Sequence, residues 1–351
     1  MKIEKYINKK ALFALVLIVI FLLCLIPPKS NNSKYSLDIY GPYGDKEAYH
    51  PKVLSFNEKW NGYKYWMVYT PYPKGDDLKE NPCIAVSNDL INWNEPKGYR
   101  SNPLDEPINK EKAKVYNSDA HLVYNEDLDR LECYWRFVDD HKNITIIYRR
   151  CSKNGINWDE KEIAFYLSDR KKADCISPAI IYENELYKMW YVQAEGVVKY
   201  AESIDGISWQ NFRNINIEYA SNLKTWHLDV IKTKNGYEML TVAFPKWNQR
   251  NDMSLYYTSS KDGFNWVKTS KILEPATKTR NWDNKGIYRA SFIYEDGIYY
   301  VFYSGTKKDY HHGIGLVVGR DINNLKGNNI DFSKENAVEK FNRMVEQEKR
   351  L

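Results

Sequence analysis

The sequence predicts an all-β fold, a five-bladed β-propeller, with an N-terminal membrane anchor helix and a C-terminal amphipathic helix. Three observations predict it. A short turn motif recurs along the chain, aromatic strand-like segments flank its copies, and one unbroken apolar run lies near the N-terminus. We therefore expect an anchor over residues 1–30, the propeller over residues 31–330 and a helix over residues 331–351.

Composition excludes several classes of protein. Of the 351 residues, 43% are hydrophobic and 15% are aromatic, which is enough for a sizeable core and too much for a disordered chain. Charged residues make up 28% of the chain, which excludes a protein with many membrane spans. The net charge is +5, and the N-terminal lysines of the first ten residues supply much of it. No long basic run remains, so nucleic-acid binding has little electrostatic support.

The apolar run ALFALVLIVIFLLCLI at residues 11–26 is interpreted as a targeting segment. As a helix it would span about 24 Å, slightly less than a bilayer core of about 30 Å. The lack of an A-x-A site favours an uncleaved anchor over a cleaved secretory signal. Leu23 is too large for the small residue that usually precedes a lipoprotein cysteine such as Cys24.

All three interpretations of this run give the same orientation. Lys9 and Lys10 stay on the cytoplasmic side, so the chain from about residue 30 onward leaves the cytoplasm. We expect a single-pass protein of the cell membrane with the propeller outside, or alternatively a secreted protein.

Four cysteines follow the run, at positions 83, 133, 151 and 175. An exported compartment permits disulfides, and Cys133 and Cys151 lie in neighbouring predicted strands. The favoured alternative is that the cysteines are small buried hydrophobic residues. No C-x-x-C pair occurs, so a zinc site has no support.

The turn motif organises the propeller. It reads SNDLINW at 87–93, SKNGINW at 152–158, SIDGISW at 203–209 and SKDGFNW at 260–266. Repeats of this size indicate a propeller or a solenoid. Ser and Asp side chains can close a tight turn, Gly accepts a positive φ, and Trp packs between sheets, so we interpret the motif as architecture.

Aromatic and β-branched segments supply three or four antiparallel strands to each repeat, as in YWMVY at 65–69 and YYVFY at 299–303. Units of this kind form propellers of four to eight blades. The segment YSLDIY at 35–40 is expected to add a strand to the last blade and close the ring. The predicted blades cover residues 35–93, 115–158, 174–209, 225–266 and 286–320.

The C-terminal residues 331–351 have a helical pattern instead. Ser333 is expected as the N-cap, and the helix is expected to pack on the outside of the propeller. A partner-binding role is the alternative. The apolar face consists of Ala337, Val338, Phe341, Met344 and Val345.

The innermost strands of the five blades align with one another. They read HPKVL at 50–54, DAHLV at 119–123, SPAII at 177–181, HLDVI at 227–231 and RASFI at 289–293. Together with the S-x-D-G-x-x-W turns, this pattern resembles the five-bladed propeller glycoside hydrolases of families 43, 32 and 130 over nearly all of residues 35–320. The turns also resemble sialidase Asp-boxes, but are one residue shorter. The resemblance implies a glycosidase that acts on a polysaccharide or oligosaccharide in the axial cavity, with no cofactor.

In the family-43 type, blades one, two and three supply a base Asp, a pKa-tuning Asp and an acid Glu, and blades four and five often add His and Arg. Inverting hydrolysis needs one protonated and one ionised carboxyl about 6.5–9.5 Å apart. Asp119, His227 and Arg289 match the positions of blades two, four and five. His50 and Ser177 occupy the base and acid positions, where the family pattern is broken. Because His can act as general acid or base near neutral pH, His50 or His227 could take part in catalysis.

The candidate site follows from this alignment. Asp229 joins it because it lies two residues after His227, on the same face of the strand. The expected catalytic residues are Asp119, His50, Asp229, His227 and Arg289. The expected substrate-binding residues, which are polar or aromatic side chains near the strand mouths, are Ser177, Asp174, Glu47, Tyr49, Trp226 and Tyr288. Further candidates in loops and at strand mouths are Asp45, Glu195, Tyr72, Trp135, Trp247 and Trp282.

Two classes of function stay open. The first is a membrane-anchored glycoside hydrolase outside the cytoplasm. The alternative is a non-catalytic glycan-binding or polysaccharide-assembly protein on the same fold, which His50 and Ser177 favour. A protein-interaction propeller is disfavoured because a scaffold needs no converging polar ring. The expected partners are a carbohydrate and a membrane, the latter through residues 11–26. No cofactor is expected; an axial Ca²⁺ near His227 is the alternative that the family offers, although no spacing of oxygen ligands requires it.

Overall fold

The computed structural model describes residues 32–99, 102–245, 252–277, 281–327 and 330–351. The predicted anchor at residues 11–26 lies outside these ranges and stays a prediction. Within them, no helix combines the length and the apolar character that crossing a membrane would need.

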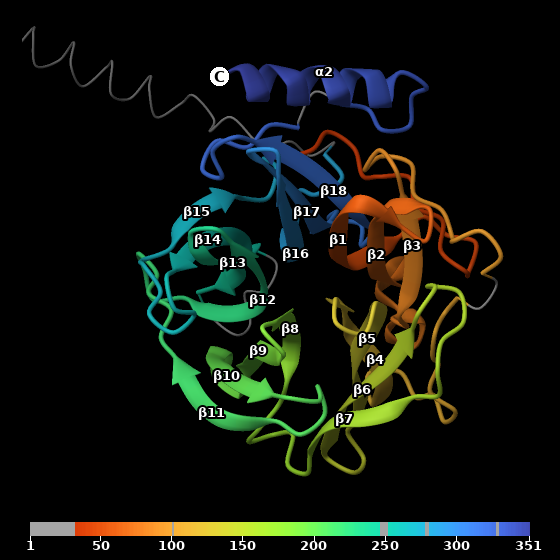
Figure 1. Ribbon diagram of the computed structural model, residues 1–351, viewed down its shortest axis with the longest axis vertical. Helices are drawn as coiled ribbons and strands as arrows, with labels where there is room; N and C mark the ends of the chain where they lie inside the picture. Colours follow the sequence, from red (N-terminus) through yellow and green to blue (C-terminus); the bar gives the residue numbers. More distant parts are fainter. Residues whose placement is uncertain (1–31, 100–101, 246–251, 278–280, 328–329) are drawn as a thin grey trace, which may run out of the picture. The chain divides into compact units, whose positions relative to one another are not determined.

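Five antiparallel sheets surround a central axis, as predicted (Figure 1). Blade 1 contains β1 (Ala48–Trp60), β2 (Tyr63–Pro71) and β3 (Cys83–Ser87). Blade 2 contains β4 (Val115–Asn125), β5 (Arg130–Asp139), β6 (Ile144–Ser152) and β7 (Glu162–Leu167). Blade 3 contains β8 (Ile176–Glu183), β9 (Leu186–Gln193), β10 (Val197–Ser203) and β11 (Gln210–Ile215).

The two remaining blades complete the ring. Blade 4 contains β12 (Lys224–Thr233), β13 (Gly236–Phe244), β14 (Ser254–Ser260) and β15 (Ser270–Leu273). Blade 5 contains β16 (Gly286–Glu295), β17 (Ile298–Thr306) and β18 (His312–Gly319). Strands follow sequence order from the axis outward, so β1, β4, β8, β12 and β16 are innermost and contact one another around the ring. Three short 3₁₀ turns, Pro73–Gly75, Asp77–Lys79 and Ala194–Gly196, lie in connections.

The ring closes differently from the prediction. Residues 35–40 form no regular strand. One backbone bond joins the segment to blade 5, from Leu37 N to Ile314 O at 2.7 Å. Leu37 and Ile39 are buried in the core that blades 1 and 5 share. Closure therefore depends on side-chain packing more than on a ladder of hydrogen bonds.

The turn motif has the predicted geometry. In the third copy, Ser203 Oγ accepts from Gly206 N at 2.9 Å, and Asp205 Oδ1 accepts from Ile207 N at 2.8 Å. Gly206 has a φ of 74°, a conformation that favours glycine. The motif thus closes a blade corner.

A C-terminal helix, α2 (Ala337–Arg350), is present, but it starts later than predicted. Its N-cap is Asn336, while the Ser333 hydroxyl donates to Asp331 Oδ1 at 2.6 Å. Ser333 is therefore occupied in a turn before the helix and caps nothing. Phe341 and Val345 are buried against blade 5, so the predicted apolar face is confirmed.

The four cysteines of the described part, Cys83, Cys133, Cys151 and Cys175, are free and buried. Cys133 pairs with Arg150 in the ladder between β5 and β6, one position away from Cys151. The favoured prediction, small buried hydrophobic residues, is thus what the structure contains.

Candidate functional site

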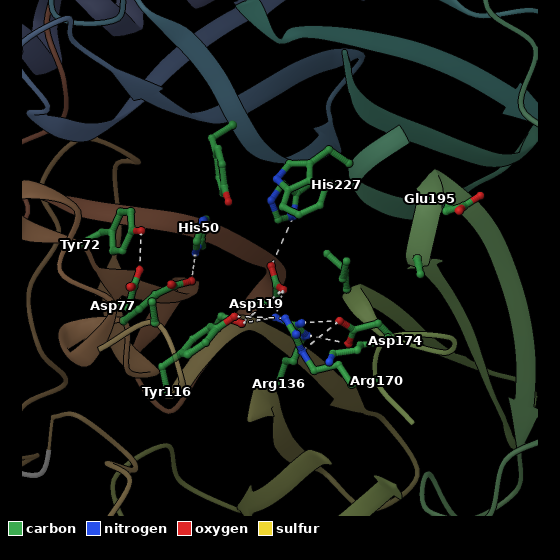
Figure 2. A pocket seen from close by; sticks show the side chains of 18 of the residues that line it. His50, Tyr72, Asp77, Tyr116, Asp119, Arg136, Arg170, Asp174, Glu195 and His227 are labelled. Atoms are coloured by element: carbon green, nitrogen blue, oxygen red, sulfur yellow. Dashed lines mark hydrogen bonds and ion pairs between the residues drawn. The ribbon is translucent and has the colours of Figure 1, made fainter. Parts of the chain in front are cut away.

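A cavity of about 650 Å³ lies where the innermost strands begin (Figure 2). We call it the axial cavity. All five blades contribute to its wall, through His50, Asp119, Ile176, His227 and Tyr288. The convergence of blades that the alignment predicts is therefore present.

A repeated backbone device shapes this end of the propeller. Each innermost strand shows a shift in pairing register as it passes the cavity. Within three of these bulges a residue has positive φ: His50 at 48°, Asp119 at 50° and Ser177 at 52°. Bulges re-aim side chains, and a left-handed residue other than glycine typically costs about 1–3 kcal/mol. The hydrogen bonds of each sheet hold these residues in the strained conformation, which indicates that the bulges position their side chains.

Asp119 lies at the meeting point of three basic side chains. Its Oδ1 atom is 3.3 Å from His227 Nδ1 and 3.6 Å from Arg289 Nη1. Its Oδ2 atom is 3.8 Å from Arg136 Nη1. All four side chains are buried. This geometry suits a carboxylate held in a fixed orientation in the wall of the cavity.

Asp174 has a different environment. Arg136 donates to it twice, from Nη2 at 2.6 Å and from Nε at 3.1 Å, and Thr145 Oγ1 donates at 2.8 Å. Burial alone would raise the pKa of Asp174, but Arg136 and Arg170 outweigh burial and the pKa is lowered. Asp174 lines the cavity, but its oxygens are engaged by arginines, so its main contribution is to orient Arg136 (Figure 2).

A buried acid–base pair faces the cavity from blade 1. His50 Nδ1 lies 2.8 Å from Glu80 Oε1 and 3.0 Å from Thr70 Oγ1. His50 Nε2 has no hydrogen-bond partner among the described residues. Burial, with the charge of Asp119 nearby, raises the pKa of Glu80 well above its usual range. Burial, with the charge of Arg289, lowers the pKa of His50. Both shifts favour a neutral pair that keeps a proton on Glu80.

Five predicted site residues are absent from the lining of the axial cavity: Arg289, which is buried beside Asp119, and Tyr49, Asp229, Ser177 and Glu47. Asp229 forms a buried ion pair with Lys52, with 2.7 Å between Oδ1 and Nζ. Ser177 Oγ donates to Leu228 O at 3.0 Å and so links blade 3 to blade 4. Glu47 accepts from two backbone N–H groups, those of residues 74 and 312. Their predicted roles stay predictions.

The aromatic candidates divide into rim and core. Trp226 and Tyr288 line the axial cavity, as does Tyr72, while Tyr49 lies behind them, 1% exposed. Trp135 is fully buried between blades 1 and 2 and is not at a strand mouth. Trp282 stacks on Tyr303, Asp45 is absent from the lining, and Glu195 is exposed at the rim. Trp247 lies outside the described residues.

The described residues contain no group of three or more His, Cys, Asp and Glu side chains that could hold a metal ion. The alternative of an axial Ca²⁺ near His227 stays untested.

Glu80 and Arg136 were missed by the sequence reasoning. Glu80 follows a 3₁₀ turn in the β2–β3 connection, and Arg136 lies on β5, the second strand of blade 2. The alignment considered the innermost strands and some of their flanking loops. The nearest available signal was the acidic sequence GDDLKEN at 75–81, which lies between two strands of one blade.

Known proteins resemble the chain in sequence and in structure. An A type blood N-acetyl-α-D-galactosamine deacetylase of Flavonifractor plautii is 31% identical over 321 residues, covering 76% of this chain. The chain spans only 41% of the length of that relative. No family model matches the sequence.

Solved structures share the fold. The crystal structure of an N-acetylgalactosamine deacetylase from F. plautii, in complex with blood group B trisaccharide, superposes with a TM-score of 0.73 at 27% identity, over 82% of this chain and 95% of that one. An exo-1,5-α-L-arabinanase from a bovine ruminal metagenomic library gives a TM-score of 0.56 at 14% identity, over 78% and 92% of the two chains. The chain therefore has the five-bladed propeller fold of the family-43-like glycoside hydrolases, and a homologue with this fold is an N-acetylgalactosamine deacetylase.

Proposed function

We propose that this protein removes the acetyl group from an N-acetylated amino sugar of a glycan bound in the axial cavity. The observation that carries the proposal is the pairing of Asp119 with the His50–Glu80 couple in one cavity, while the acid position of blade three holds Ser177. The similarity in sequence and in structure to N-acetylgalactosamine deacetylase of F. plautii supports the choice of an amide over a glycosidic bond.

Deacetylation is an acyl transfer to water. A base takes a proton as water attacks the acetyl carbonyl carbon, and an oxyanion forms. The C–N bond then breaks, the nitrogen gains a proton, and acetate and a free amine leave. The site must therefore supply a base, a stabiliser of negative charge and an acid.

The described side chains fit these three requirements. Asp119 is the proposed base, because two guanidinium groups and His227 hold its carboxylate in one place. Arg289, which is buried beside Asp119, is the proposed source of positive charge for the oxyanion. The His50–Glu80 pair is the proposed acid. His50 Nε2 donates a proton to the leaving nitrogen, and Glu80 then protonates the His50 ring at Nδ1.

A glycosidase is the second candidate. A protonated Glu80 and a carboxylate at Asp119 in one cavity are also the two groups that an inverting glycosidase requires. The acid would then come from the β2–β3 connection of blade 1 and not from the third blade.

One experiment separates the candidates. The full chain is incubated with nitrophenyl glycosides of N-acetylgalactosamine and N-acetylglucosamine, and with N-acetylated oligosaccharides. Acetate, free amine and released nitrophenol or reducing ends are measured together. We expect acetate and amine in equal amounts, and neither from an Asp119→Asn variant. Nitrophenol without acetate would identify a glycosidase, and sugar binding without any product would favour a glycan-binding protein.

We also propose that residues 11–26 anchor the protein in the cell membrane with the propeller outside the cytoplasm. The support is the lysine-flanked apolar run in the sequence. Membrane fractionation, followed by protease treatment of intact cells, tests it. Recovery of the intact chain from the soluble cytoplasmic fraction would contradict the proposal.

A further inference from the structure

A second hollow of about 320 Å³ adjoins the axial cavity. Tyr72 and Tyr288 line both hollows. The remaining walls come from β1, the β2–β3 connection, the residue before β14, the start of β16, the end of β17 and the start of β18. We call this hollow the lysine pocket, and the residues that define it apart from those two tyrosines are Tyr49, Lys74, Met253, Lys285, Tyr310 and His312.

Aromatic rings separate the two hollows. The Tyr49 ring stacks on Tyr72 at 5.7 Å between centroids and on Tyr288 at 5.4 Å. His312 lies edge-on to Tyr49 at 4.8 Å, and Tyr310 at the mouth is 58% exposed. Apolar surface with a few placed polar groups is the usual character of a ligand pocket, and the C–H faces of sugars stack on such rings. A glycan in the axial cavity could therefore continue over the tyrosines into the lysine pocket.

The charge of the lysine pocket is positive. Among the residues that the structure describes, Lys74 and Lys285 are the charged ones in its lining, and no carboxylate lines it. Glu47, which is nearby, already accepts from His312 N at 3.0 Å and Lys74 N at 3.1 Å. Lys285 Nζ lies over the Tyr310 ring, 3.4 Å from its centroid. Among the described residues, neither ammonium group has an ion-pair partner.

His312 adds a hydrogen-bonding group and no charge. Burial lowers its pKa to about 4, against the opposite effect of Glu47, and Lys285 and His311 lower it further. Its ring is therefore neutral at physiological pH. The positive charge of the pocket comes from the two lysines alone.

We propose that the lysine pocket binds a sugar unit that carries a negatively charged group, a carboxylate or a phosphate, next to the amino sugar in the axial cavity. This inference rests on the proposed function and specifies its substrate: an anionic glycan of at least two units. In the axial cavity the buried Arg136 is paired with Asp174, whereas Lys74 and Lys285 of the lysine pocket have no ion-pair partner among the described residues and can bind an anionic ligand.

The test compares anionic with neutral glycans by calorimetric binding to the full chain, in an Asp119→Asn background that prevents turnover. The probes are a chondroitin tetrasaccharide, in which N-acetylgalactosamine alternates with glucuronate, and neutral chitotetraose. At low salt we expect the chondroitin probe to bind about tenfold more tightly, because two partly exposed ion pairs contribute about 0.5–1 kcal/mol each. A pair of monosaccharides, N-acetylgalactosamine with and without a 1-phosphate, tests phosphate. A preference in either comparison supports the proposal and identifies the anion, while no preference in both overturns it.

Variants assign the preference to the two lysines. Replacing Lys74 and Lys285 together by Gln should abolish it and leave chitotetraose binding unchanged within about twofold. Replacing both by Arg should retain it, and Lys340→Gln, on an exposed position of α2, should change nothing. Equal losses for neutral and anionic probes, or the same loss in the α2 control, would overturn the assignment. Lysine-dependent binding without acetate release by the unmodified chain would refute the proposed function alone.

Discussion

Replacing Asp119 by Asn tests the proposed site most directly. Asn has the same shape and is among the residues that best tolerate a φ of 50°, so the bulge of β4 should persist. What the variant loses is the negative charge that lies 3.6 Å from Arg289 Nη1 and 3.3 Å from His227 Nδ1.

The magnitude follows from these distances. At an effective dielectric constant of about 20, unit charges separated as Asp119 and Arg289 are would attract by about 5 kcal/mol, and the desolvation of both ions offsets part of this. Loss of one partner of a buried pair typically costs about 3–5 kcal/mol. We expect the low end, because Asp229, whose charge also acts on Arg289, remains in the variant.

The assay is acetate release, measured beside thermal or denaturant unfolding. We expect kcat to fall by about 10²–10⁴, which is the usual contribution of a general base. At 1.36 kcal/mol per tenfold change, this is about 2.7–5.4 kcal/mol of transition-state stabilisation. Because Asp119 helps to raise the pKa of Glu80, the pH–rate profile should also shift its Glu80-dependent limb to lower pH in any residual activity.

Asp77→Asn is the matched control, because Asp77 lines the same cavity but accepts from Tyr72 OH at 2.8 Å and not from the basic cluster. Its kcat should stay within about tenfold of the unmodified chain. An Asp119→Asn variant that is folded and keeps more than a tenth of the original kcat would refute the role of Asp119 as base.

Four other substitutions give distinct results. Glu80→Gln should lower kcat by about 10²–10⁴. The pKa of Glu80 is raised above 4.5 in the folded chain, so the stabilisation from its bound proton is lost as pH rises. In urea unfolding between pH 4 and 8, the free energy of unfolding of the variant should therefore increase relative to that of the unmodified chain. Gly155→Ala should lower the free energy of unfolding by more than about 2–3 kcal/mol, because the new Cβ would lie 2.1 Å from the Trp66 ring. Gly297→Ala, also at positive φ but with open space around it, should lower it by about 1–2 kcal/mol. Equal losses would contradict this packing. Asp229→Asn should destabilise the fold by about 3 kcal/mol through its uncompensated lysine partner and leave kcat within about threefold, and a larger kcat loss would restore its predicted catalytic role.

The fold could be predicted from the sequence because its signals are local and repeated. Each turn motif fixes a blade corner through hydrogen bonds between residues two or three positions apart, such as Ser203 and Gly206. Each strand can be predicted from its aromatic and β-branched residues. The alignment of innermost strands also placed Asp119, His227 and His50 at one cavity. The ring closure was less predictable, because Leu37 depends on packing between the first and last blades.

The site was only partly predictable. The depth of a residue along the propeller axis explains why Asp229 lies outside the lining of the axial cavity. Asp229 and His227 share a strand face, as the alternation of strands requires, but two residues along a strand are about 6.6 Å apart. That distance takes Asp229 below the axial cavity, where Lys52 neutralises it. Periodicity indicates which way a side chain points but does not tell how deep in the channel it lies.

Glu80 was unpredictable for a different reason. It belongs to a connection, and the path of a connection is set by tertiary contacts that no periodic pattern encodes. Asp76 Oδ1 accepts from Leu78 N at 3.3 Å, and Asn81 Nδ2 donates to Leu78 O at 3.0 Å, so local bonds fold the connection back. The fold brings Glu80 to His50, which a sequence alignment of innermost strands leaves without a partner.

The backbone and the chemistry of this cavity are therefore separable. The bulges of β1, β4 and β8 hold His50, Asp119 and Ser177 in nearly the same conformation, although the three side chains differ in charge and function. A five-bladed ring can thus exchange the residue at each mouth without changing the bulge that presents it. Because Ser177 is bonded to blade 4, the proposed function needs an acid from another position, and Glu80 of the β2–β3 connection is the proposed one. In the proposed deacetylation, the acid therefore comes from the β2–β3 connection, while Asp119 on an innermost strand supplies the base and the nearby Arg289 the positive charge.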